Sequence, residues 1–354
     1  MKDKIIVILF IGYICIFSLL HIILPDKEIS SSERRKLVSF PKIEMTNEYI
    51  SKIDEYLLDH FPFRDKFRGI KALFNYKILN KLDNNNIYLK DNYIFKSNYP
   101  TNDKSINHFI KTTNTLKNKL SEKNNVYMMI IPDKNYYLKD KDFLQIDYDY
   151  IFSKVDEIDI EKIDIKNILE LNDFYETDTH WKQERINKVI EKMNKTMNFN
   201  YKKIEYKENV YNNFYGVYYG ESALDRKPEK LTYLTNDILD NVKVTYLEDP
   251  SLKTIYNKDN LKGLDSYDVY LDGPSAYIEI ENKDATTDKE LVIFRDSLGS
   301  SLTPLLVPYY KKITVIDNRY FHSDFLGNLI EFKNQDVLFV YSTLLINESL
   351  SLKG

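Results

Sequence analysis

Asp178 and His180 are the two residues of this chain whose types and spacing point most directly to chemistry. They lie in the segment Thr177-Asp178-Thr179-His180-Trp181, beside the only tryptophan. In an extended segment, side chains two residues apart point the same way, so both could reach one site. A carboxylate that accepts from one imidazole nitrogen sets the tautomer and leaves the other nitrogen as a base. The pair therefore predicts two members of a nucleophilic triad.

Ser297 is the predicted nucleophile. It follows the apolar run Leu291-Val292-Ile293-Phe294, which is typical of a buried strand, and it lies in Arg295-Asp296-Ser297-Leu298-Gly299. In open α/β sheets ligands collect at the carboxyl ends of the strands, where a serine on the turn into a helix is exposed. The serine N–H is then also an oxyanion donor. Ser297, His180 and Asp178 are the predicted catalytic residues.

Two other interpretations of these residues stay open at this point. In the first, the aspartate is a cap, the histidine is satisfied in the core and the serine belongs to a turn. In the second, Asp178 and His180 are metal ligands, but no other histidine stands at ligand spacing from a second histidine, so no metal is predicted. No glycine-rich loop joins a strand to a helix, so no nucleotide cofactor is predicted either.

Five further residues are candidates for substrate or oxyanion contacts. Gly273 lies in the turn Asp272-Gly273-Pro274, and Asn347 follows a strand pattern. Arg319 also follows a strand and could face an anionic group, or it could pair with Asp317 or a helix end. The complete set is Trp181, Arg295, Arg319, Gly273 and Asn347.

The elements that position these residues alternate between helices and strands, which predicts an α/β fold with a parallel layer. A hairpin is expected over residues 87–95, and residues 198–290 predict a β-rich insertion that shapes the groove. Helical periodicity covers residues 47–58, 66–82, 106–120 and 186–197, with one or two helices over 151–171 and one after Ser297 that is broken by Pro304 and Pro308. Buried strands are expected at residues 126–131, 291–294, 313–316 and 337–341.

The amino terminus predicts a membrane anchor. Ile5 to Leu24 carries no formal charge and is long enough to cross a bilayer. No small-residue cleavage pattern precedes Pro25, so an uncleaved signal anchor is expected, with the domain after it translocated. The predicted organisation is an anchor over residues 1–25, a polar linker over 26–45 and a catalytic domain over 46–354.

Charge and cysteine content narrow the class of protein. The 50 basic and 54 acidic residues give a net charge of −4, and the lysines are scattered among acids, so no nucleic-acid partner is expected. The only cysteine, Cys15, lies in the predicted anchor, so the remaining chain has no thiolate for a metal site.

Several motifs together resemble the DHHW proteins, relatives of the alginate O-acetylation proteins of the AlgX/AlgJ type within the SGNH-hydrolase-like superfamily. The resemblance runs from about residue 33 to 345. One departure is Thr179, where DHHW proteins typically have histidine, and another is the helix start Lys182-Gln183-Glu184. The motifs are Asp59-His60-Phe61-Pro62-Phe63-Arg64-Asp65, Pro132-Asp133-Lys134, Thr177-Asp178-Thr179-His180-Trp181, Arg295-Asp296-Ser297 and Ile316-Asp317-Asn318-Arg319-Tyr320.

This resemblance implies a three-layer SGNH-like sandwich with a mainly parallel sheet and permuted order, Asp-x-His before Ser. It implies Ser297 as nucleophile, His180 as base and Asp178 as its orienting carboxylate. The expected activity is O-acetylation of a cell-surface polysaccharide outside the membrane, beside a multi-pass membrane acyltransferase that supplies acetyl groups. The alternatives are an acetylesterase with the same triad and a non-catalytic glycan-binding scaffold.

Overall fold

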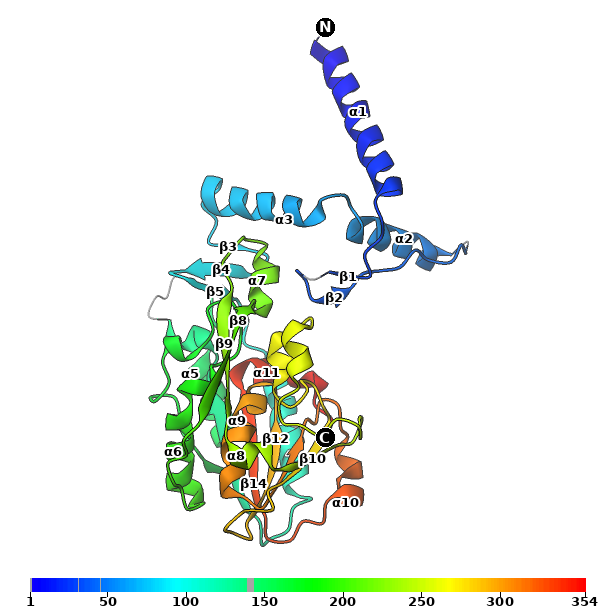
Figure 1. The fold of residues 1–354 in the computed structure, drawn as a ribbon. Helices are drawn as coiled ribbons and strands as arrows, with labels where there is room; N and C mark the ends of the chain where they lie inside the picture. Colours follow the sequence, from blue (N-terminus) through cyan, green and yellow to red (C-terminus); the bar gives the residue numbers. More distant parts are fainter. Residues whose placement is uncertain (1, 31, 45, 139–142) are drawn as a thin grey trace. The chain divides into compact units, whose positions relative to one another are not determined.

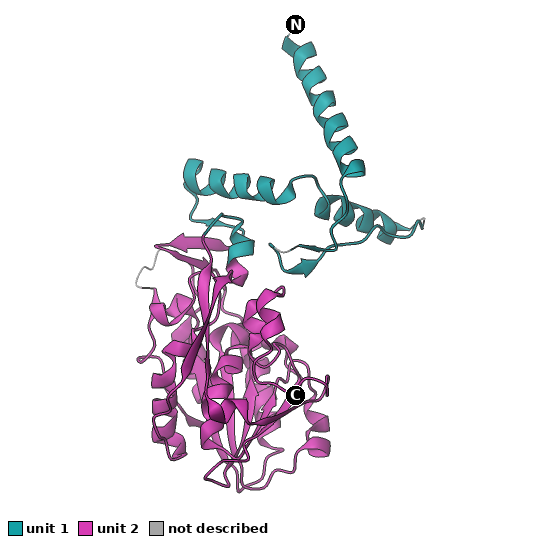
Figure 2. Cartoon of the chain, in the orientation of Figure 1, with its two compact units in different colours: residues 1–85, 219–226 teal, residues 86–218, 227–354 magenta. Residues whose placement is uncertain are grey.

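The computed structural model describes residues 2–30, 32–44, 46–138 and 143–354 of the chain. Met1, Ser31 and Met45, which fall in the predicted anchor and linker, lie outside the described residues. The chain forms two compact units (Figures 1 and 2). Unit 1 comprises residues 1–85 and 219–226, and unit 2 comprises residues 86–218 and 227–354.

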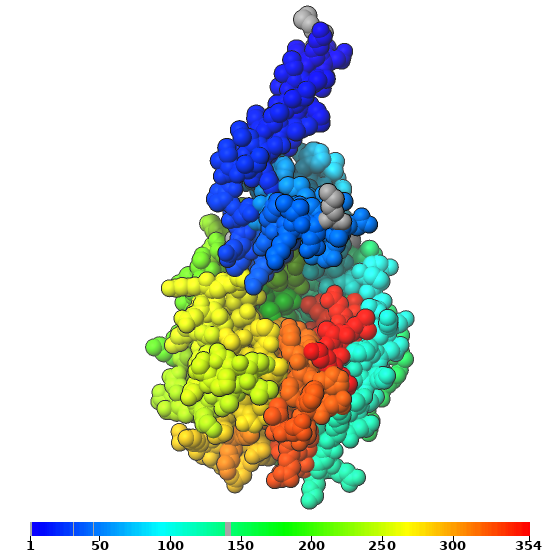
Figure 3. Space-filling model, turned by 90° about the vertical axis from the view of Figure 1, so that its right-hand side faces the viewer, coloured from blue at the N-terminus to red at the C-terminus, as the bar shows by residue number. Residues whose placement is uncertain are grey.

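Unit 1 begins with the long apolar helix α1, Lys2–Ile23. It is the only helix among the described residues that is long and apolar enough to cross a membrane, and none of its described side chains is buried (Figure 3). The remaining elements are β1 (Ile29–Ser30), β2 (Arg35–Lys36), α2 (Asn47–Asp59), α3 (Arg64–Leu73), a π-helical turn (Phe74–Ile78) and β3 (Asp83–Asn84). Strands β1 and β2 pair antiparallel.

Unit 2 is built on a seven-stranded sheet in the order β10-β11-β13-β12-β14-β6-β7. The five strands from β13 to β7 are parallel, and β10 and β11 add an antiparallel edge. The strands are β6 (Asn125–Ile131), β7 (Glu161–Lys162), β10 (Lys243–Tyr246), β11 (Tyr277–Glu281), β12 (Glu290–Arg295), β13 (Lys312–Ile316) and β14 (Asp336–Ser342).

Helices cover both faces of this sheet, so the unit has three layers. Alternate residues of β12 show the arrangement: Ile293 packs into one core with α6 and α9, and Phe294 packs into the other with α4 and α5. This alternation follows from the pleat of a strand, and burial of both faces explains why β12 is apolar throughout. The helices are α4 (Asp103–Lys117), α5 (Tyr148–Asp156), α6 (Asn187–Met197), α8 (Asp237–Asp240), α9 (Leu298–Leu306), α10 (Leu326–Leu329) and α11 (Thr343–Asn347).

Two hairpins stand apart from the main sheet. The first, β4 (Ile87–Lys90) with β5 (Tyr93–Lys96), turns at Asp91, whose φ of 52° lies in the left-handed region. The second, β8 (Lys207–Phe214) with β9 (Glu229–Thr235), encloses the short helix α7 (Val217–Ser222). Of the strands in residues 198–290, β10 and β11 extend the main sheet and β8 and β9 form this hairpin.

Three expected elements differ from the structure. Residues 151–171 hold one α-helix, the part of α5 up to Asp156, and then β7; Ile163 and Ile165 are buried in the core but lie outside any helix. The helix expected to reach Leu82 ends its helical turns at Ile78. Helix α9 runs through Pro304 to Leu306 instead of breaking there, and a 3₁₀ turn with Pro308 follows.

Candidate active site

The segment that carries Asp178 and His180 is a tight loop closed by a bridge between Phe174 and Trp181. Asp178 Oδ1 accepts the His180 backbone N–H at 3.0 Å, so the aspartate side chain itself holds the turn. The extended geometry expected from the sequence is therefore wrong for this loop. Asp178 and His180 still converge, because the turn folds the His180 ring back onto the Asp178 carboxylate.

Asp178, His180 and Ser297 form one chain of hydrogen bonds. His180 Nδ1 lies 2.5 Å from Asp178 Oδ1, and His180 Nε2 lies 2.8 Å from Ser297 Oγ, although 117 residues separate histidine and serine. With the carboxylate on Nδ1, the tautomer that leaves Nε2 free to accept the serine proton is favoured. The structure thus places the three predicted residues in hydrogen-bond contact.

Ser297 stands between the end of β12 and the first residue of α9, of which it is the N-cap residue. Its neighbour Asp296 secures the turn: one carboxylate oxygen accepts Leu298 N–H at 3.0 Å and the other accepts Ser342 N–H at 2.7 Å from the end of β14. Adjacent parallel strands β12 and β14 therefore hold the serine at the carboxyl edge of the sheet, as expected for an open α/β sheet.

The imidazole of His180 is held by an aromatic stack as well as by hydrogen bonds. The Tyr267 ring lies parallel to it, with centroids 3.7 Å apart and an interplanar angle of 8°. Tyr267 donates its hydroxyl to Ser301 at 2.7 Å, and burial raises the pKa of Tyr267 well above its ordinary value. Tyr267 is therefore a neutral, fixed wall against the histidine, which is itself only 7% exposed.

Trp181 contacts the start of α9, directly after Ser297. Its indole N–H donates to the Leu298 carbonyl at 3.1 Å and to Ser301 Oγ at 2.9 Å, and the ring is fully buried. A buried tryptophan with its N–H satisfied cannot present that group to a substrate. The structure gives Trp181 a positioning role between the histidine loop and α9.

Two side chains that the sequence did not single out as site residues hold the histidine loop. Lys134, 1% exposed, directs its ammonium at the carbonyls of Tyr175, Glu176 and Asp178, at 3.1, 3.1 and 2.6 Å. Glu229 accepts the N–H groups of Glu176 and Thr177 at 2.6 and 2.7 Å. The loop is therefore clamped at both its carbonyls and its N–H groups. Lys134 follows a buried strand in the sequence, but nothing local there indicates its target.

The second oxygen of Asp178 is used by another segment. Asp178 Oδ2 accepts the N–H of Val217 at 2.7 Å, and the neighbouring Gly216 N–H donates to Thr177 Oγ1 at 2.9 Å. A Cβ atom on Gly216 would lie 2.1 Å from the Thr177 carbonyl oxygen. Only glycine allows this approach, so the loop after β8 holds the second carboxylate oxygen of Asp178 through the Val217 N–H.

Arg295 and Arg319 share one buried carboxylate, Asp317. Arg319 lies 2.6 and 2.9 Å from it, and the fully buried Arg295 lies 3.5 Å from it and donates to the Gly273 carbonyl at 3.0 Å. Of the alternatives left open for Arg319, pairing with Asp317 is the one observed. Arg295 is 0% exposed and cannot meet a substrate, so it braces the ends of β12 and β13. Arg319, whose side chain is 22% exposed, is held by Asp317.

The two candidate oxyanion donors are occupied elsewhere. The Gly273 N–H donates to the Tyr270 carbonyl at 3.1 Å. Both amide hydrogens of Asn347 are used by the carbonyls of Asn98 and Pro100, at 3.0 and 3.1 Å. Neither residue has a donor free for an oxyanion in this structure. Among the described residues, no cluster of three or more histidine, cysteine or acidic side chains could hold a metal ion.

Comparison with known proteins gives matches at the level of the fold. No family model and no curated protein sequence matches the chain. A DHHW family protein from Eubacterium siraeum superposes with a TM-score of 0.64 at 20% identity, over 77% of this chain and 97% of that one. Bacillus cereus PatB1 with a sulfonyl adduct superposes with a TM-score of 0.58 at 19% identity, over 73% and 97%.

A third match is weaker. The O-acetyltransferase domain of Pseudomonas putida AlgJ aligns with a TM-score of 0.42 at 12% identity, over 74% of this chain and 92% of that domain, which is too low to support an argument. The two stronger matches show that the chain has the fold of a DHHW family protein, as the motifs predicted. At these identities the likeness extends to the fold and not to the chemistry.

Proposed function

We propose that the chain is a serine acyltransferase that moves acetyl groups onto hydroxyls of a cell-surface polysaccharide. The observation that carries the acyl-transfer part is the hydrogen-bond chain from Asp178 through His180 to Ser297, at 2.5 and 2.8 Å. The acetyl group and the polysaccharide come from the motif resemblance to DHHW proteins. The shared fold is consistent with that resemblance.

The proposed reaction has two halves, each a proton transfer coupled to bond formation. In the first, His180 Nε2 takes the proton of Ser297 Oγ while the oxygen attacks the acetyl carbonyl of the donor. The proton then passes to the leaving group and the acetyl ester of Ser297 remains. In the second, His180 takes the proton of a sugar hydroxyl, whose oxygen attacks the acetyl carbon, and the proton returns to Ser297.

The oxyanion formed in each half needs donors near Ser297. The serine N–H stands at the start of α9, where the first N–H groups of a helix lack partners within the helix and the dipole is positive. It is the donor that we assign to the oxyanion. Charge on the imidazolium is balanced by Asp178, which keeps its two oxygens on His180 and on Val217 N–H.

The proposal includes the location of the enzyme. Helix α1 has the length and hydropathy of a single membrane span, and we assign it as an anchor that holds the catalytic unit on the outer side of the cell membrane. A multi-pass membrane acyltransferase is the proposed source of acetyl groups. These parts rest on the sequence pattern and on the motif resemblance.

The test uses the full chain in detergent with a chromogenic acetyl ester and a soluble oligosaccharide acceptor. Ser297→Ala and His180→Ala should abolish acetyl-enzyme formation, and Ser153→Ala, a serine on the exposed surface of α5, should not. Because PatB1 has been captured with a sulfonyl adduct, a sulfonyl fluoride is a suitable probe. It should modify wild type at Ser297 and leave Ser297→Ala unmodified.

The outcomes separate the competing functions. Acetylated oligosaccharide identifies a transferase, whereas acetyl-enzyme that reacts only with water identifies an esterase with the same triad. If wild type and both triad variants are equally inert toward ester and sulfonyl fluoride, the acyl-transfer proposal is wrong and a glycan-binding scaffold replaces it.

A further inference from the structure

We infer that the segment from Leu57 to Leu82, which holds the end of α2 and all of α3, lies in the interface of the membrane that α1 crosses, with an exposed apolar face against lipid. This inference rests on the proposed anchoring by α1 and adds a second, shallow membrane contact to it. All the residues that carry it belong to unit 1.

The first observation is an apolar face, formed by α3 with its N-cap residue and the π-helical turn after it, that the described residues leave largely exposed. Its side chains recur at spacings of three and four residues, which places them on one side of the helix. They are Phe63, Phe67, Ile70, Leu73, Phe74 and Ile78, with exposures of 51%, 40%, 61%, 52%, 50% and 65%. Leu57 and Leu58 at the end of α2 add a further 44% and 67%. A contiguous set of this kind marks an interaction surface.

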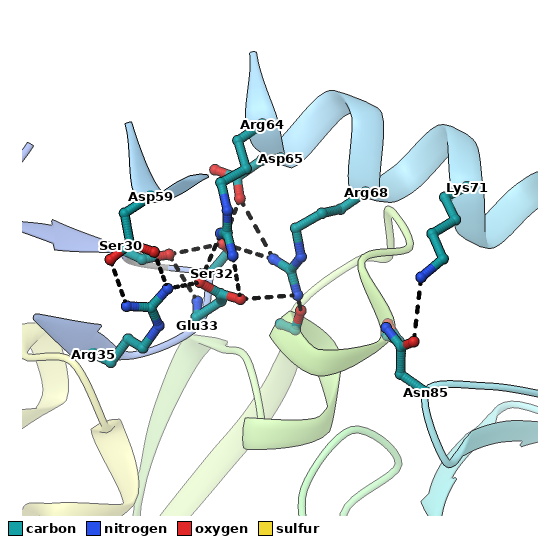
Figure 4. A network of polar contacts seen from close by, with 12 residues as sticks. Ser30, Ser32, Glu33, Arg35, Asp59, Arg64, Asp65, Arg68, Lys71 and Asn85 are labelled. Atoms are coloured by element: carbon teal, nitrogen blue, oxygen red, sulfur yellow. Dashed lines mark hydrogen bonds and ion pairs between the residues drawn. The ribbon is translucent and has the colours of Figure 1, made fainter. Parts of the chain in front are cut away.

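The second observation is that the opposite side of the segment is tied down. Arg64 forms a two-pronged ion pair with Glu33 at 2.7 and 3.0 Å, and Arg35 pairs with Asp59 (Figure 4). Arg68 donates to the Gly220 carbonyl at 3.0 Å. Because the polar side is held by these contacts, the apolar face cannot turn inward.

The third observation indicates that lipid covers the apolar face, because it gives the position of the segment along α1. Phe17 of α1 stacks on Phe61, with ring centroids 5.4 Å apart and an interplanar angle of 6°, and it also contacts Phe67 at 5.8 Å. Phe17 lies six residues before the end of α1 at Ile23, or about 9 Å along the helix axis. In a hydrocarbon core about 30 Å thick, this depth places Phe61 and Phe67 among acyl chains.

The charge of the segment fits the same occupant. Between Arg64 and Leu82 there are six basic residues and one acid, Asp65. Arg64 and Arg68 are used in the ion-pair network, and the lysines at 66, 71, 77 and 81 are exposed. The Lys66 ammonium lies over the Phe63 ring at 5.7 Å, within the range of a cation–π contact. An apolar helix face in a segment with exposed lysines is typical of a helix that lies on anionic lipid.

The single cysteine of the chain makes the experiment direct. Wild type has only Cys15, which is exposed on α1, and a Cys15→Ser background accepts one new cysteine at a time. Each protein is labelled with an environment-sensitive fluorophore and reconstituted into vesicles of phosphatidylcholine and phosphatidylglycerol. Quenching by lipids that carry a nitroxide near the headgroup then reports the depth of each position.

Two test positions and one control are compared. Ile70→Cys and Phe74→Cys lie on the apolar face, and Lys52→Cys lies on the polar side of α2, where Lys52 pairs with Glu48. The inference expects the labels at 70 and 74 to be quenched at least about threefold more than the label at 52, as for a helix seated 5–10 Å into the interface.

The label at Cys15 separates failure of the anchor from failure of the inference. If Cys15 is in the bilayer and the labels at 70 and 74 are as exposed to water as the label at 52, the inference is wrong. The apolar face would then be a surface that another protein covers, not lipid. If Cys15 itself is exposed to water, α1 is not a membrane span, and both the anchor and the inference that depends on it fail.

Discussion

The two carboxylate oxygens of Asp178 have separate partners, and the consequences of changing them differ. Oδ1 accepts the ring N–H and the backbone N–H of His180, and Oδ2 accepts the N–H of Val217. All three partners are hydrogen-bond donors, so a neutral side chain that carries an NH₂ group cannot accept all three hydrogen bonds. We therefore expect that the negative charge and the shape of the Asp178 carboxylate are both required for activity.

Asp178→Asn is expected to lower kcat/KM for a chromogenic acetyl ester by about 10³- to 10⁴-fold, because an amide on Nδ1 favours the tautomer that cannot accept the serine proton. Sulfonylation of Ser297 should slow in parallel. Asp288→Asn, at an exposed carboxylate paired with Lys311, is the matched control and should leave the rate unchanged. A loss smaller than about tenfold would remove Asp178 from the proposed mechanism.

Lys134 is a second residue whose charge state has a measurable consequence. Burial lowers its pKa to about 7, against the pull of Asp178, Glu229 and Asp133, which favour the charged form. An unfolded lysine holds its proton to a pKa near 10.4. Between these values the unfolded state binds more protons, so the free energy of unfolding rises with pH there and the cost of the buried charge is largest below pH 7.

Lys134→Met removes this group, so the unfolding free energy of wild type minus that of the variant should increase from pH 7 to pH 9. The slope should approach about 1.4 kcal/mol per pH unit. The fluorescence of Trp181, the only tryptophan, reports the unfolding of unit 2. A difference that stays flat over this range would mean that the three carbonyls around the Lys134 ammonium hold its proton, together with the rings of Tyr93, Phe95 and Tyr218 at 5.8, 5.4 and 4.9 Å.

At the scale of elements, the site depends on how closely two loops approach. The loop after β8 meets the histidine loop through Gly216 N–H on Thr177 and Val217 N–H on Asp178. No side chain fits at residue 216, because a Cβ there would overlap the Thr177 backbone. Separation of the loops would remove the Val217 N–H from the Asp178 carboxylate and give its side chain more freedom.

Gly216→Ala is therefore expected to destabilise the folded chain by on the order of 2–4 kcal/mol and to lower the rate of acyl-enzyme formation. Gly327→Ala is the matched control, since nothing lies within 4 Å of a Cβ at that position. Thermal unfolding and ester turnover measure the two effects. If both alanine variants behave alike, close packing at Gly216 does not support the site.

At the scale of the whole molecule, the chain combines an apolar helix with an α/β unit that carries the candidate active site. Among the described residues of α1 no side chain is buried, although Phe17 contacts Phe61 and Phe67. Such a surface is stable in water only if something covers it, and the bilayer is the cover that we propose.

Membranes washed with alkaline carbonate are expected to retain the wild-type chain, because a spanning helix is not extracted. Leu9→Arg with Ile16→Arg places two charges in α1 and should release most of the protein, since each arginine costs about 2.5–3.5 kcal/mol at the centre of a span. Ile43→Arg with Leu144→Arg, at residues 80% and 66% exposed, is the control and should stay in the membrane fraction. Release of wild type by the same wash would rule out the anchor.

The sequence by itself determined the features that depend on residues close together along the chain. The apolar run of α1, the strands β6, β12, β13 and β14, the hairpin of β4 and β5 and the helix α6 all follow from local periodicity. The motif set also predicted the DHHW fold, which the superpositions show. Local pattern placed a serine after one strand and an Asp-x-His pair in a loop before a helix.

Only the tertiary structure decided what those residues contact. The order β13-β12-β14-β6 brings the end of β12, the Asp296 contact on β14 and Lys134 after β6 to one edge of the sheet. The same packing directs the Gly273 N–H and the Asn347 amide to backbone carbonyls away from Ser297, and it pairs Arg319 with Asp317. Buried polar groups take whichever partner the packed chain brings within reach, and residues far apart in sequence supply most of these partners. Local periodicity does not predict these partners, which is why the contacts of Tyr267, Glu229 and Lys134 with the histidine loop emerged only from the fold.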